Sequence, residues 1–199
     1  MKIEIKGMEA LKAKLHAFPK ELARAERNAV NTTATAVKNL GIDEAFKSYH
    51  VDKKSRLKKD SRGRDVSFIK RAREGEITAR VIFRGGDNPK AGDRIGIQHF
   101  KVDKQARNKK EKGWRPSIKV LHSGAAEKIE HGFYGVGKLK GQGIFQRQGG
   151  GRKLVRRTGP SLKQMVERAG VYSAVEQKGH DILKQALTVA INKQIAKRK

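Results

Sequence analysis

The sequence predicts an α+β fold, in which a small antiparallel sheet packs against a long N-terminal helix and a C-terminal helix. Two observations lead to this prediction. Apolar residues recur with helical spacing near both ends of the 199-residue chain, and short apolar runs separated by glycine occupy the middle. Helices, then strands, then helices are the order expected of an α+β domain. We expect one domain over residues 1–199, with flexible basic loops at about 85–115 and 132–151.

The N-terminal part is expected to be mainly helical. Ile3 and Ile5 alternate with charged residues and predict a short edge strand, and a short helix is expected up to Phe18. Pro19, whose missing N–H costs nothing in a first turn, begins a second helix that runs to about Leu40. Small residues in the apolar stripe of this helix favour close packing against a neighbouring element. The stripe consists of Leu22, Ala25, Ala29, Thr33, Ala36 and Leu40.

The next segment changes from helical to alternating spacing. Gly41 is expected to interrupt the long helix before it resumes for two turns, and a basic helix is expected at Val51–Lys59. Alternating apolar residues then predict strands at Asp65–Lys70 and Ile77–Phe83, joined by a turn around Gly75.

Short strands and a glycine-rich hairpin are expected in the second half of the chain. Strands at Ile95–His99 and Ser117–Leu121 precede a short helix at Ala125–Glu130. Strands at Gly143–Arg147 and Lys153–Arg157 then flank three consecutive glycines, which predicts a hairpin.

The C-terminal part returns to helical spacing. A sharp break at Thr158–Ser161 precedes a short helix at Leu162–Ala169. Ser173 is expected to cap a long last helix, because a serine hydroxyl accepts a hydrogen bond from a free N–H of the first turn. Cations that include Lys197 lie at the end of this helix that the helix dipole favours.

Positive charge runs almost from end to end of the chain. Forty-seven Lys and Arg face twenty Asp and Glu, a net charge of +27, and no acidic residue occurs from Gly132 to Val166. Such a chain repels itself, which indicates a polyanionic partner, nucleic acid being the obvious one; a merely solubilising surface is the alternative. Only 36% of the residues are hydrophobic, so the core is expected to be thin and completed by assembly with other subunits.

The sequence supports neither an enzyme nor a cofactor or metal site. It has no cysteine, and none of its six histidines are spaced i, i+4. Gly149–Lys153 resembles a phosphate loop but lacks the Walker spacing, and a hairpin tip explains it better. No apolar run approaches the ~20 residues of a membrane span, and the N-terminal residues do not resemble a signal peptide. We expect no membrane partner.

Charge without a base-reading motif predicts contact with phosphates rather than with base edges. The candidate phosphate-contacting or DNA-facing residues are the cations of two dense basic segments. These are Lys53, Lys54, Arg56, Lys58, Lys59, Arg147, Arg152, Lys153, Arg156 and Arg157. Apolar residues near the glycine-rich segment are candidates for a partner interface, with ordinary packing as the alternative. These are Phe133, Tyr134, Ile144, Phe145 and Trp114.

The order of these features resembles the minor tail protein Z, or tail completion, family of long-tailed bacteriophages, of which the lambda protein is the type member. The resemblance spans nearly the whole chain at low identity. It rests on five features in sequence order: the Asn-Thr-Thr-Ala step Asn31–Ala34, the basic segment Val51–Lys59, the strands that follow, Phe145–Arg147 among glycines, and Gly159–Ser161 before a terminal helix with a basic end.

The resemblance implies a structural virion protein at the head-proximal end of the tail, which completes the tail for joining to the head. It implies a homo-oligomer, expected to be a hexameric ring around the DNA channel and assembled in the host cytoplasm. Expected partners are tail terminator or tail tube proteins, head–neck connector proteins, and DNA bound without sequence specificity. The alternative is a nucleoid or ribosome-associated protein that binds nucleic acid generally.

Overall fold

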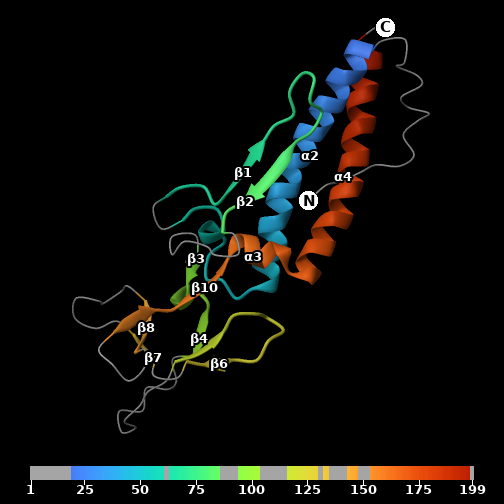
Figure 1. The fold of residues 1–199 in the computed structure, drawn as a ribbon. Helices are drawn as coiled ribbons and strands as arrows, with labels where there is room; N and C mark the ends of the chain where they lie inside the picture. Colours follow the sequence, from blue (N-terminus) through green and yellow to red (C-terminus); the bar gives the residue numbers. More distant parts are fainter. Residues whose placement is uncertain are drawn as a thin grey trace. The chain divides into compact units, whose positions relative to one another are not determined.

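The structure is a computed structural model that describes residues 19–60, 63–85, 94–103, 116–129, 132–134, 143–147 and 153–197. It confirms the α+β class: two long helices, α2 (Pro19–Ser48) and α4 (Ala169–Ala196), accompany short antiparallel sheets (Figure 1). The strand and helix expected within residues 1–18 lie outside the described residues. The chain divides into two compact units, each described here by itself, and the expected single domain stays a prediction.

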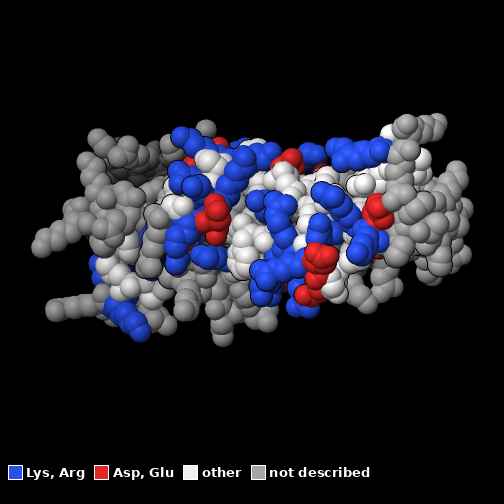
Figure 2. All heavy atoms as spheres, turned by 90° about the horizontal axis from the view of Figure 1, so that it is seen from above, with Lys and Arg blue, Asp and Glu red and all other residues white. Residues whose placement is uncertain are grey.

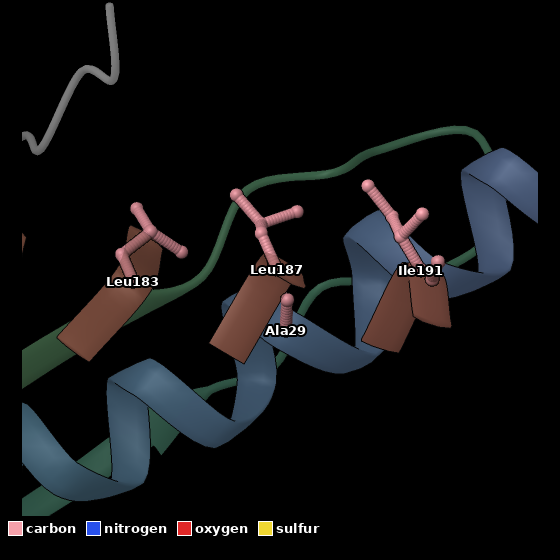
Figure 3. Packing of buried hydrophobic residues seen from close by; sticks show 5 residues of the cluster. Ala29, Leu183, Leu187 and Ile191 are labelled. Atoms are coloured by element: carbon pink, nitrogen blue, oxygen red, sulfur yellow. The ribbon is translucent and has the colours of Figure 1, made fainter. Parts of the chain in front are cut away.

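Unit 1 comprises the described parts of Met1–Glu44, Ser67–Phe83 and Arg168–Lys199. Within it α2 and α4 lie side by side and antiparallel (Figure 1). Ala25 and Ala29 of α2 are buried against Leu187 and Ile191 of α4, as Figure 3 shows for Ala29. The small side chains of α2 therefore accept the larger side chains of α4, as the alanine-rich stripe predicts.

A β-hairpin completes unit 1. Strands β1 (Ser67–Lys70) and β2 (Arg80–Phe83) pair antiparallel, as predicted, with Ser67 opposite Phe83. Asn31 of α2 holds the chain that follows β1: its Nδ2 donates to the carbonyl of Ala72 at 3.3 Å, and its Oδ1 accepts from the Ala72 N–H at 2.8 Å. One side-chain amide thus satisfies both backbone groups of Ala72.

Gly41 does not interrupt α2, contrary to the prediction. The helix continues through it to Ser48, and the glycine is buried beneath the Phe83 ring. A Cβ at this position would lie 2.7 Å from Cζ of Phe83. The glycine therefore serves the approach of β2 and leaves the helix unbroken.

Unit 2 comprises the described parts of Ala45–Val66 and Arg84–Glu167. Its described elements form three antiparallel sheets, β10–β3, β4–β5–β6 and β7–β8–β9, with two 3₁₀ turns and one short helix. They are η1 (Lys54–Leu57), β3 (Arg94–Gly96), η3 (Ile97–His99), β4 (Lys101–Asp103), β5 (Ser117–Lys119), β6 (Glu127–Lys128), β7 (Gly132–Tyr134), β8 (Ile144–Arg147), β9 (Leu154–Arg156), β10 (Thr158–Ser161) and α3 (Leu162–Glu167).

The Gly-Pro-Ser segment, Gly159–Ser161, packs closely in unit 2 and leads directly into α3. Gly159 lies against the ring of Phe100, which a Cβ at this position would overlap. Ser161 is fully buried and caps α3: its Oγ accepts from the Gln164 N–H at 3.3 Å, and Gln164 Oε1 accepts from the Ser161 N–H at 3.0 Å. This reciprocal pair is a capping box, which the Ser-x-x-Gln spacing could have predicted.

Two segments predicted as helices have other structures. Val51–Lys59 contains only the single turn η1, because its closely spaced cations repel one another along a helix; buried Leu57 holds that turn in place. In Ala125–Glu130, β6 pairs with β5, so tertiary pairing overrides the local helical preference.

Two further predictions need correction at the residue level. The strand expected at Ile95–His99 ends at Gly96, and η3 follows. Ser173 lies inside α4, where its Oγ donates to the Gly170 carbonyl at 3.4 Å, and Arg168 occupies the N-cap position. The antiparallel pairing of β8 and β9 is confirmed, with Phe145 opposite Arg156, and the glycines expected at the tip of this hairpin lie outside the described residues.

The α2–α4 contact generates the first prediction. Ile191→Ala is expected to lower the free energy of unfolding by about 2–5 kcal/mol because it leaves a cavity, and Ala29→Leu by about 1–3 kcal/mol because it overpacks the contact. Val189→Ala is the control, since that side chain is 66% exposed. Urea unfolding followed by circular dichroism measures all three. A loss for Val189→Ala as large as for Ile191→Ala would contradict this packing.

The contact between Gly41 and Phe83 generates the second prediction. Alanine in a helix normally stabilises by up to about 1 kcal/mol relative to glycine. Gly170→Ala is expected to raise the urea midpoint, because nothing lies within 4 Å of its Cβ position. Gly41→Ala is expected to lower the midpoint, because Phe83 must move. Equal gains in both variants would show that the Phe83 ring moves aside without cost.

Candidate phosphate-binding surface

The predicted phosphate-contacting cations of both basic segments lie in unit 2, apart from Arg152, which lies outside the described residues. Cations are not confined to these segments: on the face of the molecule seen from above in Figure 2, lysine and arginine atoms lie at many places and acidic atoms at few. Of the predicted phosphate-contacting cations that the structure describes, Arg56 is half-buried and the rest are exposed. The exposed ones are Lys53, Lys54, Lys58, Lys59, Arg147, Lys153, Arg156 and Arg157.

The first basic segment is shaped by two aspartates that bind arginines. Arg56 Nε donates to Asp52 Oδ1 at 2.7 Å. Asp60, whose side chain is only 1% exposed, accepts from the Arg64 N–H at 2.9 Å and from its guanidinium at 2.7 Å. Gly63, at φ 74°, closes this turn. Each aspartate therefore orients an arginine beside the exposed lysines.

The second basic segment belongs to the sheet β7–β8–β9. The register places Phe133 opposite Phe145, and Phe145 opposite Arg156, so these three share one face. Two residues along β8, Arg147 returns to that face, with its guanidinium carbon 5.8 Å from the centre of the Phe133 ring. Two arginines and one half-buried aromatic ring therefore lie together on the sheet.

His99 lies beside the first basic segment and is influenced electrostatically by both basic segments. Its Nδ1 lies 3.4 Å from Asp52 Oδ2, and its Nε2 lies 3.2 Å from Gln98 Nε2. Burial lowers the pKa of His99, Arg56 and Arg156 lower it further, and Asp52 opposes them. Two predicted phosphate-contacting residues from distant segments therefore act on one imidazole. Neither His99 nor Asp52 stood out in the sequence, because a lone histidine and an Asp-Lys step carry no spacing signal.

The predicted partner-interface residues divide by burial. Ile144 and Phe145 are buried within the chain at 0% and 7% exposure, so ordinary packing describes them. Phe133 and Tyr134 are half-buried, and burial raises the pKa of the Tyr134 hydroxyl. Trp114 lies outside the described residues. Contact of Phe133 or Tyr134 with a partner stays a prediction.

Among the described residues, no group of three or more His, Cys, Asp or Glu side chains is placed to hold a metal ion. None of the helices in the described part of the chain is long and apolar enough to cross a membrane. Comparison with known proteins finds no matching family model, curated protein or solved structure.

The convergence on His99 predicts opposite pKa changes in two kinds of variant. Asp52→Asn is expected to lower the pKa of His99, because the carboxylate that favours the imidazolium is removed. Arg56→Gln and Arg156→Gln are each expected to raise it. NMR titration of the imidazole C2–H measures the pKa, with Lys184→Gln on α4 as the control. An unchanged value in Arg156→Gln would show that the two segments do not meet in solution.

Proposed function

We propose that this chain is a structural protein of a phage tail that completes the head-proximal end of the tail and contacts DNA without reading its sequence. The observation that carries this proposal is the convergence of Arg56 and Arg156 at His99. Cations from two segments that lie far apart in the sequence both lower the pKa of His99, which supports a shared cationic surface in unit 2. A surface of this kind suits a sugar–phosphate backbone.

The composition of the surface supports contact with phosphate rather than with bases. Phosphate contacts need only exposed cations, whereas base readout needs an element that enters a groove. Phe133 supplies one half-buried ring beside Arg147, which is too little for a run of stacked bases. Binding by many weak ionic contacts lets DNA pass along the protein, as a channel lining requires.

The assembly part of the proposal rests on the resemblance and on β9. Leu154 and Val155 of this strand are 38% and 37% exposed, and cations flank them. Exposed apolar residues on a strand are suited to contact with another subunit. The proposed assembly is a homo-oligomeric ring, with tail tube or terminator proteins and head–neck connector proteins as neighbours.

Quantitative mass spectrometry of purified particles tests the proposal, with the major tube protein as the internal count. A subunit of a six-fold ring is expected at about six copies per particle. Absence from intact particles would overturn the tail proposal. Salt-dependent binding of the free protein to DNA and RNA alike would then favour a general nucleic-acid-binding protein.

Reversal of two exposed cations separates DNA contact from folding. Arg156→Glu/Arg157→Glu is expected to leave the urea midpoint nearly unchanged, because both side chains are exposed. It is expected to weaken DNA binding and to reduce the slope of log K against log salt by about two, one for each lost phosphate contact. Lys184→Glu/Lys193→Glu on α4 is the matched control. An equal loss of folded, soluble protein would contradict a role in DNA contact.

A further inference from the structure

A second cluster of basic groups lies in unit 2, on β4 and β5. The register places Lys101 directly opposite Lys119, and Lys128 of β6 lies opposite Ser117, two residues along the strand from Lys119. Like charges that face each other across an antiparallel pair destabilise it. Among the described side chains, neither Lys101 nor Lys119 takes part in an ion pair. The pair is therefore a concentration of positive charge that an anion would relieve.

Two histidines lie beside these lysines. The His50 N–H donates to the Val120 carbonyl at 2.9 Å, and the His122 N–H donates to the Ser48 carbonyl at 3.1 Å. This backbone pairing, which includes a bridge between Tyr49 and Leu121, brings the two imidazole centres to 3.6 Å. Burial lowers the pKa of His50, and His122, Lys101 and Lys119 lower it further. All four basic groups therefore act at one place.

A pocket of about 330 Å³ opens at this cluster. Apolar side chains that include Phe46, Tyr49 and Phe100 line it, and His50, His122 and Lys101 stand at its polar part. Its one acidic residue, Asp52, already binds Arg56 at 2.7 Å and lies 3.4 Å from His99. Arg56 therefore offsets part of the charge of Asp52. The pocket has the size of a small-ligand site, which suits a ring-sized group attached to an anion.

We propose that His50, His122, Lys101 and Lys119 bind a backbone phosphate of nucleic acid, while the attached sugar or base enters the neighbouring pocket. The inference rests on the proposed contact with DNA and assigns a discrete site to it. A phosphodiester presents two unshared oxygens, which the ammonium and imidazole N–H groups can share. The apolar walls of the pocket explain a nucleotide better than they explain free phosphate.

Binding at this site is expected to be coupled to protonation. The groups that face His50 are His122, Lys101 and Lys119, with Asp52 in the same pocket. A bound phosphodiester adds negative charge beside them, so it raises the pKa of His50 and favours the imidazolium. A phosphodiester keeps one charge between about pH 5 and 8, the range in which histidine titrates. Affinity at the site therefore increases as the pH falls through the pKa of His50.

NMR titration of the full chain with the tetranucleotide dT4 tests the site. The C2–H resonances of His50 and His122 are assigned with His50→Gln and His122→Gln. Both resonances are expected to shift on addition of dT4, and the pKa of His50 is expected to rise, while His180 on α4 does not respond. Lys101→Gln/Lys119→Gln is expected to weaken binding read at these imidazoles about tenfold. Lys184→Gln/Lys193→Gln is the matched control and is expected to leave it unchanged.

Three results would overturn the inference. One is the absence of any shift at His50 and His122 when dT4 binds elsewhere on the chain. Another is an equal weakening in both double-lysine variants, which would show diffuse attraction only. The third is a response to tetraglutamate but not to dT4, which would assign the cluster to an acidic protein partner.

The dT4 titration tests the phosphate site independently of the proposed tail function. If the chain is found in particles but dT4 does not reach this pocket, only the site is overturned. If dT4 binds the pocket but the chain is absent from particles, the site is supported and the tail proposal is overturned.

Discussion

Close approach of α2 and α4 is the constraint on which unit 1 depends. The chain has few large apolar residues to bury, so each contact between elements must be narrow and well matched. Ala25 and Ala29 meet this requirement because their methyl groups leave room for Leu187 and Ile191 of the facing helix. Gly41 applies the same principle to the hairpin, where the missing side chain makes room for a ring of β2. Small residues therefore allow a chain with limited apolar surface to form a closely packed core.

Unit 2 meets the same shortage of apolar residues in another way. Its described strands have two to four residues, too few to form stable sheets alone, so local devices join them. Gly159 lets Phe100 lie on the backbone, and the box of Ser161 and Gln164 begins α3. Fully buried Leu57 anchors the basic turn η1. These three local contacts stabilise the backbone that carries the cations, although the surrounding elements are short.

The few acidic residues of unit 2 position positive charge more than they neutralise it. Asp52 and Asp60 each bind an arginine with short hydrogen bonds, while most of the neighbouring lysines stay exposed. The pairing of Lys101 with Lys119 shows the same imbalance inside a sheet. Under the proposed function, nucleic-acid phosphates supply the opposite charge that the chain lacks. The resulting attraction would be strong in total and adjustable by salt, because it is the sum of many exposed contacts.

The sequence by itself determined the α+β class, the alanine-rich stripe, the β1–β2 hairpin, the pairing of β8 with β9 and the exposure of most candidate cations. These features follow from local spacing, turn residues and charge, which act over a few positions. Tertiary structure alone decided that Gly41 continues a helix, that β6 is a strand and that Ile144 is buried. It also decided that Arg56 and Arg156 act on His99. These outcomes depend on contacts between segments far apart in the chain, and strand register, which places such segments beside each other, is not encoded in the periodicity of any one of them.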